Sequence, residues 1–433
     1  MGSEMCIRDS SKTLRVLSDS GVHDHLGGGF FRYCTDLKWS QPHYEKILSD
    51  NALILSTFSR VERAQKDGSH NPVIRGIITW LNREMGSPAT GYASSLSAES
   101  DGIEGGLYEW EQADMITALG MDEGQQFFSI LPPLSNAHNR KLPQLIANEH
   151  VSIEKQKQWV EKLKEIRGQR TLCMRDEKRL LAHNALLVSA FIEAAIALGD
   201  KTLLDDAVKL EEWITREFQI NDHRIRSFLY PETAVDSWAN LDDYCFWIQA
   251  MLDLQSVGSL SCKECPNHYL EKALKFTFEV IRKFKDFENP GFFFTEKNCQ
   301  TPMPCRKKIW YDNSTPSGNS TLLRIFSKLH HLTKDQQWMI EFEENLSGFV
   351  NIAKNAPEGI AHALTAICQE ATGFLSLRIP KTKTSFALIS KLPARPLFIS
   401  RSGQEKKFQV INGRGEIILN TEKISLFLEY LEN

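Results

Sequence analysis

A succession of long helices is the feature that most constrains this chain. Apolar residues recur at i, i+3 and i+4 through ten segments, which is the pattern of helices with an apolar face. The segments are 42–66, 73–85, 153–168, 178–198, 203–218, 242–257, 269–284, 316–332, 335–354 and 358–371. Short strand-like pieces lie between them, at 91–95, 107–110, 224–229 and 292–295. The pattern predicts a mainly all-α protein.

The expected helices are of two kinds. Segments 178–198 and 42–66 are apolar around most of their circumference, whereas 153–168 and 335–354 have one apolar face and many charges. A helix that is apolar all round is buried on every side. Inner and outer helices therefore alternate, and pairs that begin near 178, 242 and 316 predict stacked helical hairpins. A closed two-layer helical toroid satisfies the pattern.

The two ends of the chain differ from this pattern. After about residue 372 we expect short strands at 385–389, 396–400, 408–411 and 417–419 and a helix at 422–431. The expected organisation is a toroid domain at 12–375 followed by a small α+β segment at 376–433. The first residues, MGSEMCIRDS, fit neither part, and we predict that 1–11 is a non-native, adaptor-like leader.

Charge and cysteine content bear on partners and location. The 51 Lys and Arg residues are balanced by 55 Asp and Glu residues of mixed order, which argues against nucleic acid as a partner. The most apolar stretch, 185–198, is shorter than the ~20 residues of a membrane span, and no apolar signal core begins the chain. Nine cysteines without a signal are typical of reduced thiols. We expect a cytoplasmic protein and no membrane partner.

The segment 24–51, DHLGGGFFRYCTDLKWSQPHYEKILSDN, is the most unusual in the chain. Three glycines precede two aromatic residues and Arg32, and glycines of this kind allow close backbone approach. If 42–66 is one helix, His43 and Asp50 lie on one face of it, where they could act as an acid and a base. The alternative is that both are hydrogen-bonded polar groups inside a packed helix.

A second polar segment is the turn within 92–110. Glu99, Asp101 and Glu104 occupy a glycine-flanked turn between two expected strands. These carboxylates either line the mouth of the helical barrel or form an ordinary solvent-facing turn.

Two helix starts carry polar residues that fit plain capping as well as binding. Asp176 is expected to be the N-cap of the helix that contains His183 and Asn184. Asn240, with Asp242 and Asp243 after it, fits a cap followed by acids that favour the helix dipole.

A third helix start lies in the segment 310–321. Here we expect Thr315 as N-cap and Pro316 at the first helical position, with Ser317 and Asn319 in the first turn. Small side chains would leave the first-turn N–H groups open to a ligand hydroxyl, carboxylate or phosphate. Plain capping is the alternative here too.

No cofactor and no metal are expected. Cys262-x-x-Cys265 with His268 lacks a fourth ligand at zinc-site spacing, and no βαβ pattern surrounds it. The chain also has no phosphate-binding loop, dinucleotide fingerprint or nucleophile elbow.

Several motifs occur together in a specific order: DHLGGGFFRY, PHYEK with the following DNA, EG-GLYEW, RDEK, LDDYCFWIQAMLDL, GFFFT and TPSGNST. From about residue 12 onward the chain resembles the YyaL-type family of thioredoxin-domain-containing proteins, which includes the spermatogenesis-associated members. The resemblance implies a six-hairpin toroid similar to N-acylglucosamine 2-epimerases and many glycosidases. It implies no established reaction.

The chain also departs from that family. The resemblance implies an N-terminal thioredoxin-like domain and a first barrel helix with Gly-Gly-Phe-Gly and Pro-Lys-Phe-Pro, and neither is found in the sequence, so we expect a toroid without its first helix. Ser97-Ala98-Glu99 stands where the family has Asp-Ala-Asp, and His183-Asn184-Ala185 where it has Trp-Asn-Gly. The loss of a loop acid bears on any two-carboxylate mechanism.

The leading hypothesis is an (α/α)6-toroid protein whose cleft binds a sugar or related polyol and acts on it by acid/base chemistry. Two carboxyl groups ~5 to 9 Å apart would favour glycoside hydrolysis, and a pair such as His43 and His183 would favour 2-epimerase-like proton abstraction. The rival hypothesis is a non-catalytic regulatory or partner-binding barrel that serves a thioredoxin domain in cis, or a truncated fragment.

The candidate residues are those that the hypothesis would gather at the mouth of the toroid. The acid/base candidates are His43, Asp50, Glu99, Glu104 and Asp243, and the substrate-binding candidates are Arg32, Tyr33, Asp176, Lys178, His183, Asn184, Asp242, Tyr244, Ser317 and Asn319.

Overall fold

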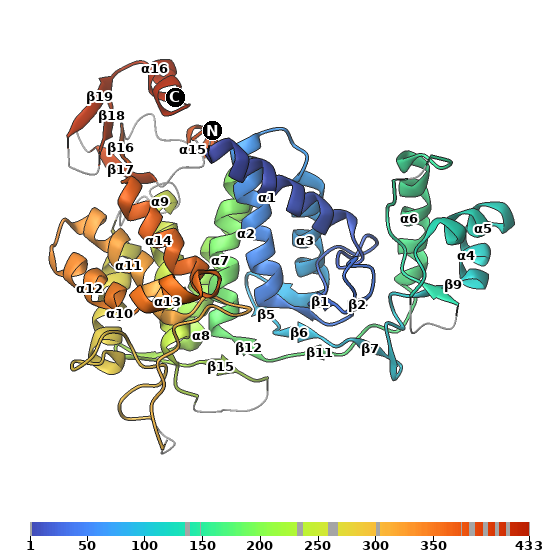
Figure 1. Cartoon of the computed structure of the whole chain (residues 1–433), viewed down its shortest axis with the longest axis horizontal. Coiled ribbons are helices and arrows are strands. Elements are labelled where there is room, and N and C mark those ends of the chain that lie inside the picture. The colour runs from blue at the N-terminus through green and yellow to red at the C-terminus, as the bar shows by residue number, and fades with distance from the viewer. Residues whose placement is uncertain are drawn as a thin grey trace. The chain divides into compact units, whose positions relative to one another are not determined.

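The computed structural model describes residues 2–134, 139–147, 149–231, 237–258, 267–299, 304–373, 375–380, 386–392, 397–402, 407–412 and 416–432. The chain forms two compact units, shown in Figure 1. Unit 1 is Met1–Ser87 with Tyr92–Lys178, and unit 2 is Pro88–Gly91 with Arg179–Asn433.

Unit 1 consists of helices joined by strands of two residues each. Its helices are α1 (Gly2–Asp19), α2 (Leu48–Gln65), α3 (Asn71–Trp80) with a π-helical turn at Leu81–Met85, α4 (Gln112–Leu119), α5 (Met121–Ile130) and α6 (Ile153–Arg167). Its strands are β1 (Tyr33–Cys34), β2 (Pro42–His43), β3 (Lys46–Ile47), β4 (Gly86–Ser87), β6 (Ser95–Leu96), β7 (Glu99–Ser100), β8 (Ile103–Glu104), β9 (Trp110–Glu111), β10 (Arg140–Lys141) and β11 (Arg175–Asp176). Strand β5 (Gly91–Tyr92) lies at the limit between the units.

Helix α2 begins later than the periodicity predicts. The expected helix at 42–66 is wrong in its first turns, because 42–43 pair with β1 and 46–47 pair with β6. Ile47 is the extended N-cap of α2. Backbone pairing to distant strands therefore overrides the local helical pattern, and His43 and Asp50 do not share a helix face.

The glycine-rich loop of unit 1 covers a buried group of charges. Asp24 accepts hydrogen bonds from Lys46 Nζ and Arg167 Nη1, each at 2.7 Å. Lys46 also donates to the Gly28 carbonyl at 2.8 Å and is completely buried. Its ammonium lies 5.0 to 5.2 Å from the ring centres of three aromatic residues, Phe31, Trp80 and Tyr108. Such a cation is stable in the interior only because it is paired and faces π-electrons.

Glycine is required at the centre of that loop. Gly28 has φ +79°, and a Cβ there would lie 2.3 Å from the Gly76 carbonyl oxygen. Because that atom belongs to the backbone, the clash has no easy relief, and the three-glycine motif is explained by close packing of the loop against α3.

Helices α4 and α5 are absent from the sequence expectation. They are short, with Gly120 between them at φ +92°, so neither shows enough periods to stand out. Their apolar side chains pack with α6 in a local core. The largest members of that core are Trp110, Phe127 and Trp159.

Unit 2 is a row of helical hairpins. Its helices are α7 (Leu181–Leu198), α8 (Lys201–Phe218), α9 (Leu241–Gly258), α10 (His268–Phe284), α11 (Gly318–Thr333), α12 (Gln337–Ser347), α13 (Val350–Asn355) and α14 (Ala361–Thr372), with a 3-10 turn at Pro357–Ile360. Short strands β13 (Gln219–Asn221), β14 (Arg224–Ile225) and β15 (Phe228–Leu229) connect the first two hairpins, and β12 (Arg179–Leu180), which precedes α7, pairs with β15. The predicted strand at 292–295 is reduced to one bridge, between Lys285 and Phe292.

The inner and outer helices of unit 2 alternate as predicted. Helix α9 packs on both α7 and α11, whereas α8, α10 and α12 each pack against the preceding helix of their own hairpin. Helix α7 is the one described helix whose length and composition would also allow it to cross a membrane, and 61% of it is buried within the protein. Its apolar residues are accounted for by its packing between α8 and α9.

A four-stranded sheet follows the hairpins. The strands β16 (Leu375–Pro380), β17 (Leu397–Ser402), β18 (Phe408–Ile411) and β19 (Ile417–Thr421) lie in the order β17-β16-β18-β19, with β16 and β17 parallel. Helix α16 (Ile424–Glu432) covers it, and the Phe408 and Phe427 rings lie 4.9 Å apart. The predicted strand at 385–389 is wrong, because Phe386–Ile389 is the short helix α15.

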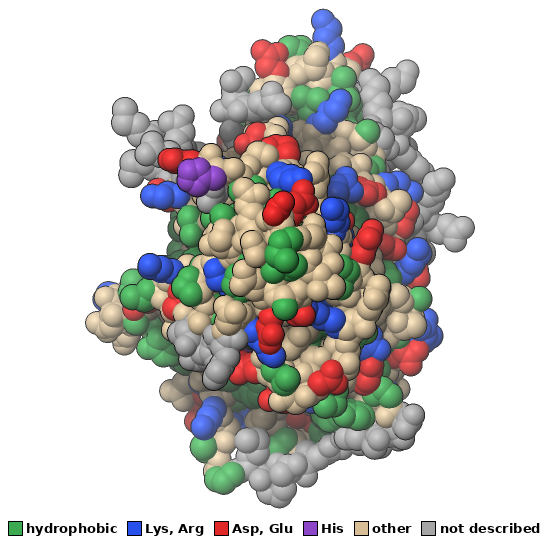
Figure 2. Space-filling view, turned by 90° about the vertical axis from the view of Figure 1, so that its right-hand side faces the viewer, with side chains coloured by type: hydrophobic (Ala, Val, Ile, Leu, Met, Phe, Trp, Pro, Cys, Tyr) green, Lys and Arg blue, Asp and Glu red, His purple; other side chains and the backbone are tan. Residues whose placement is uncertain are grey.

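The predicted class is confirmed: the chain is an (α/α)-hairpin protein with a small α+β C-terminal segment. The closure of six hairpins into a ring and the limits at 11, 12, 375 and 376 stay predictions. On the face shown in Figure 2, acidic and basic side chains are interspersed, in agreement with the near-neutral composition.

Candidate functional site

Asparagines near the starts of two helices fix the backbone in both units. Asn51 Oδ1 accepts from the Phe30 N–H at 2.7 Å, and its amide donates to the Phe30 carbonyl at 3.0 Å. Asn319 binds the N–H and carbonyl of Phe292 in the same way, at 2.8 and 3.0 Å. Each phenylalanine follows a glycine of positive φ, Gly29 or Gly291. The repeated arrangement joins a glycine-phenylalanine segment to the start of a helix.

The start of α11 does not leave its N–H groups open. The N-cap is Ser317 rather than Thr315, and its Oγ accepts from the Ser320 N–H at 3.1 Å. The Gly318 N–H donates to Asp242 Oδ1 at 2.8 Å. The expectation of a free anion-binding turn is therefore wrong at Gly318, because a carboxylate of the protein already occupies the position a ligand would take.

Asp243 also binds helix starts. It accepts from the Asn240 N–H at 2.9 Å, which is the cap arrangement expected from the sequence. Burial raises the pKa of Asp243 to about 6, although hydrogen bonds from Asn240, Ser227 and the Ala182 N–H oppose the shift. Burial and the nearby charge of Asp243 raise the pKa of Asp242 to about 7. The two carboxyl groups thus join the starts of α7, α9 and α11.

The other unit 2 candidates face protein groups as well. Asn184 donates to the Leu180 carbonyl at 2.9 Å, and the Tyr244 hydroxyl receives a hydrogen bond from Lys283 Nζ at 2.8 Å. Burial lowers the pKa of His183 to about 4, so this ring is neutral near pH 7. The hydrogen bonds of Asn184 and Tyr244 and the burial of His183 give each residue a structural role, and a role in ligand binding stays a prediction.

Asp176 is not the N-cap of α7. It lies in β11, paired with Ser95, and its Oδ1 accepts from the Lys178 N–H at 3.1 Å. The helix begins only at Leu181, with Leu180 as its N-cap. Lys178 Nζ lies 3.5 Å from Asp176 Oδ2, so these two candidates form a local ion pair within unit 1.

A cavity of about 680 Å³ in unit 1 contains two of the predicted catalytic residues. This volume is within the usual range for small-molecule sites. Strand β2, the hairpin of β7 and β8, and the pair of β9 and β10 contribute side chains to it. We name it the His43 cavity, and it is lined by Thr35, Gln41, Pro42, His43, Tyr44, Ile103, Glu104, Glu109, Glu111, Leu134 and Arg140.

His43 and Glu104 come together at this cavity although they are far apart in sequence. His43 Nε2 lies 4.0 Å from Glu104 Oε1. The Tyr33 ring stacks on the His43 ring with centres 5.1 Å apart and planes 10° from parallel, because β1 and β2 pair Tyr33 with His43. Among the described residues, His43 Nδ1 has no hydrogen-bond partner. Stacking on the Tyr33 ring thus fixes the plane of the His43 imidazole, and the Glu104 carboxylate lies beside it.

Glu109 supplies a second carboxyl group to the His43 cavity. The Tyr44 hydroxyl donates to Glu109 Oε1 at 2.7 Å. Burial raises the pKa of Glu109, the hydrogen bond from Tyr44 and the charge of Arg140 oppose the shift, and the negative charge of Glu104 adds to it. Glu109 is therefore the carboxyl group of this cavity whose protonated form the surroundings favour.

Besides Tyr33, Asp176 and Lys178, three other unit 1 candidates are not among the residues that line the His43 cavity. Arg32 is paired with Glu45 at 3.2 Å. Asp50 lies in the first turn of α2, where burial raises its pKa to about 6 despite the charge of Arg32. Glu99 is exposed and sits opposite Glu104 in the β7–β8 pairing.

Sequence reasoning missed Tyr44, Glu109 and Arg140. Tyr44 and Glu109 lie in PHYEK and GLYEW, which the sequence singles out as motifs but not as chemistry. A signal was present in GLYEW, where Glu109 lies between two aromatic residues, Tyr108 and Trp110. Arg140 lies outside any motif, and only the pairing of β10 with β9 places it beside Glu111.

No group of three or more His, Cys, Asp or Glu side chains that could hold a metal ion occurs within the described ranges. Cys262 and Cys265, which are expected to be free thiols, lie outside those ranges.

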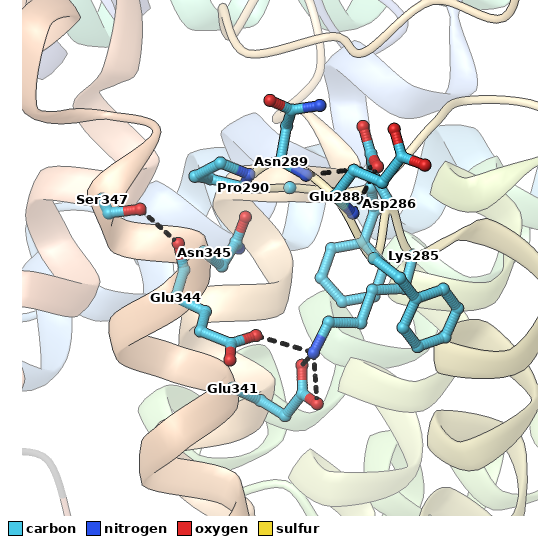
Figure 3. A pocket seen from close by; sticks show the side chains of 12 residues that line it. Lys285, Asp286, Glu288, Asn289, Pro290, Glu341, Glu344, Asn345 and Ser347 are labelled. Carbon is cyan, nitrogen blue, oxygen red and sulfur yellow. Dashed lines mark hydrogen bonds and ion pairs between the residues drawn. The ribbon is translucent and has the colours of Figure 1, made fainter.

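Unit 2 has a smaller cavity of about 300 Å³ between the loop at 285–292 and α12, shown in Figure 3. Lys285 Nζ lies 2.7 Å from carboxylate oxygens of both Glu341 and Glu344. Asp286 pairs with Lys308 at 2.7 Å, and this hydrogen bond lowers its pKa to about 2. Lys285 and Asp286 are thus each paired with a charged side chain of the protein, which favours a structural role for them.

Comparison with known proteins agrees with the family resemblance of the sequence. No known family model matches the chain. Spermatogenesis-associated protein 20 of Rattus norvegicus is 25% identical over 426 residues, which cover 87% of this chain and 53% of the rat protein. The chain thus spans about half the length of this curated relative.

Two solved structures are similar to this chain. One is the GH76 α-mannanase of Bacteroides thetaiotaomicron, with a TM-score of 0.46 and 10% identity over 98% of this chain and 93% of that one. The other is the cellobiose 2-epimerase of Spirochaeta thermophila, with a TM-score of 0.46 and 13% identity over 84% of each chain.

Proposed function

We propose that the His43 cavity binds a sugar or related polyol and promotes hydrolysis of a glycosidic bond by acid/base chemistry. The observation that carries the proposal is the unequal pair of carboxyl groups in one cavity. The surroundings of Glu109 favour its protonated form, whereas Glu104 lies at the surface beside His43. Carboxyl groups with such different environments are the usual arrangement of an acid and a base.

Each group has a place in the reaction. The Tyr44 hydroxyl donates to one oxygen of Glu109, so in the protonated form of Glu109 the other oxygen holds the proton that is given to the bridging oxygen of the glycoside. The bond from that oxygen to the anomeric carbon breaks, and a water oxygen bonds to the anomeric carbon. Glu104, with the His43 imidazole beside it, accepts the one proton that the water loses, and the return of a proton to Glu109 through solvent restores the site.

The lining of the cavity suits a polyhydroxyl ligand. Carboxylates and Arg140 offer both hydrogen-bond acceptors and donors at its wall. The Tyr33 ring is 48% exposed and provides a flat apolar surface next to His43. Sugars combine hydroxyl groups with an apolar ring face, so polar groups and an exposed aromatic ring complement them together.

Epimerisation is less well supported. It rests on a histidine pair, and the His43 cavity has one histidine among its described lining residues. Hydrolysis needs only the two carboxyl groups, which this cavity provides.

The test combines calorimetric binding with an assay for newly formed reducing ends. The probes are glucose, mannose, N-acetylglucosamine and the disaccharides cellobiose, maltose, mannobiose and chitobiose. We expect Glu109→Gln to bind the active sugar with similar affinity and to turn over about 100-fold more slowly, because general acid catalysis contributes that much. Glu161→Gln, on the exposed side of α6, is the matched control. Folded protein that binds none of these sugars would refute the proposal.

A second candidate function follows from the length of the relative. The matching region covers about half of spermatogenesis-associated protein 20, which leaves room for a regulatory or partner-binding role beside a thioredoxin domain. In that case the unmodified protein has no catalytic activity, and His43→Ala and Asp50→Ala change only the stability of the fold. If the unmodified protein turns over a sugar substrate and His43→Ala abolishes this turnover, the protein is an enzyme.

We also propose that the protein is cytoplasmic. The nine cysteines, an odd number spread thinly along the chain, are typical of reduced thiols and support this location. Fractionation of cells that express a tagged chain tests it, and recovery in a secretory fraction would contradict it.

A further inference from the structure

A second cavity adjoins the His43 cavity in unit 1. It has a volume of about 410 Å³ and shares four lining residues with its neighbour: Ile103, Glu109, Glu111 and Arg140. Two cavities with four common residues are separated by little more than those side chains. We call the second one the Arg170 cavity.

Glu109 lies at the junction, and the local backbone fixes it there. A Cβ at Gly105 would lie 2.9 Å from Glu109 Oε1 and 2.6 Å from the Tyr44 ring, and Gly105 has φ +72°. Only glycine leaves room for the Tyr44–Glu109 hydrogen bond at this point. On the other side, Arg170 Nη1 donates to the Glu109 carbonyl at 2.7 Å. The proton donor of the proposed reaction is thus held from both cavities.

The Arg170 cavity has polar walls. Arg170 is ordered by a hydrogen bond to Asp114 Oδ2 at 3.2 Å and by its guanidinium, which lies 3.8 Å from the Trp110 ring centre. Gln169 and Thr171 add uncharged polar groups. Its lining has four acids, Asp101, Glu109, Glu111 and Asp114, and two arginines, Arg140 and Arg170, so it offers both donors and acceptors with acceptors in excess, which suit the O–H donors of a sugar. Such a lining suits a polyhydroxyl group better than an anion.

We infer that the substrate consists of at least two linked sugar units, one in each cavity, with the bond to be broken next to Glu109. This inference rests on the proposed function. His43 and Glu104 line only the first cavity, so the unit that carries the reacting anomeric carbon lies there. The leaving unit lies in the Arg170 cavity and receives the proton of Glu109 on its bridging oxygen. A monosaccharide fills the first cavity alone.

The experiment compares each monosaccharide with its own disaccharide by calorimetry. The pairs are glucose with cellobiose and maltose, mannose with mannobiose, and N-acetylglucosamine with chitobiose. Gln169→Ala removes an exposed side chain that lines only the Arg170 cavity. For the disaccharide that binds, we expect the variant to lose about tenfold in affinity, while the matching monosaccharide changes by less than about twofold. Gln158→Ala, exposed on α6, is the matched control.

The outcomes separate this inference from the proposed function. If monosaccharides bind and no disaccharide binds more tightly than its own monosaccharide, the two-unit substrate is wrong and the sugar site stands. The same holds if Gln169→Ala weakens both partners of a pair equally. If the folded protein binds no sugar of any pair, the proposed function itself fails.

Discussion

At the residue scale, the most informative group is buried and takes no part in the proposed chemistry. The sequence marks 24–51 by its glycines, and the structure shows that they surround the pairing of Asp24 with Lys46 and Arg167. Burial opposes the ionisation of Asp24, but the two cations outweigh it and hold the pKa of Asp24 well below its ordinary value. This carboxylate therefore stabilises the fold above about pH 4, and the contribution is lost at lower pH.

Asp24→Asn should destabilise the protein by about 3 kcal/mol at pH 7, because it leaves two buried cations without their anion. Urea unfolding at pH 7 followed by circular dichroism measures the change. Asp19→Asn, at an exposed pair with Arg15, is the control and should leave the midpoint unchanged. A midpoint for Asp24→Asn equal to the wild-type value would contradict the role of the buried charges.

A comparison of two glycines with similar φ angles separates the energetic cost of a left-handed backbone from the cost of a packing clash. Gly28 has φ +79° and faces the Gly76 backbone, whereas Gly102 has φ +74° and a Cβ added there would meet no described atom within 4 Å. Gly102→Ala should cost about 1 kcal/mol for the left-handed conformation alone. Gly28→Ala should cost about 3 kcal/mol or more, because the clash with a carbonyl is added. Equal costs in thermal unfolding would show that the packing against α3 is unimportant.

The sequence predicts the residues of the site less well than the fold. His43 and Glu104 are sequence candidates and do meet in one cavity, but the helix face that His43 was expected to share with Asp50 does not exist. Glu109 was missed because its importance depends on burial beside Tyr44, a contact across 65 residues. Spacing along a chain cannot show such a contact.

At the element scale, the start of α9 links three helices through two acids. The pKa of Asp242 is raised to about 7, so the folded protein holds a proton that the unfolded chain has lost above about pH 4. Stability therefore falls as the pH rises from about 4 to 7, since the folded state must give up that proton.

Asp242→Asn should remove this pH dependence and keep the acceptor for the Gly318 N–H. The free energy of unfolding of the variant, relative to that of the wild type, should increase by about 1 to 3 kcal/mol from pH 4 to pH 8. Chemical unfolding at several pH values measures the difference. Asp205→Asn, at an exposed i,i+4 pair on α8, should show a constant difference from wild type. A constant difference for Asp242→Asn as well would rule out the titration.

Long helices were predicted best because their apolar residues repeat over many turns. The expected 178–198 and 203–218 correspond to α7 and α8 within three residues at each end. Predictions failed where a short element or a distant partner decides the structure. The α4–α5 pair is too short to show a period, and the residues before α2 pair with strands from other parts of unit 1.

At the scale of the whole molecule, the protection of backbone amides against hydrogen exchange should follow the alternation of inner and outer helices in unit 2. The inner helices α7 and α9 pack on neighbours on both sides, whereas α8 and α10 pack mainly within their own hairpins. Backbone amides near the middle of α7 and α9 should exchange with deuterium at least about tenfold more slowly than those of α8 and α10. Mass spectrometry of peptic fragments measures the rates. Slower exchange in α8 and α10 would contradict the assignment of inner and outer layers.

The asparagines that bind Phe30 and Phe292 also have a meaning for how such a chain can change over generations. Asn51 and Asn319 each fasten a glycine-phenylalanine segment to its own helix within its own unit. A stretch of gene that encodes one such segment with its helix therefore carries both of these hydrogen bonds together, whereas the bond from the Gly318 N–H to Asp242 depends on a neighbouring hairpin.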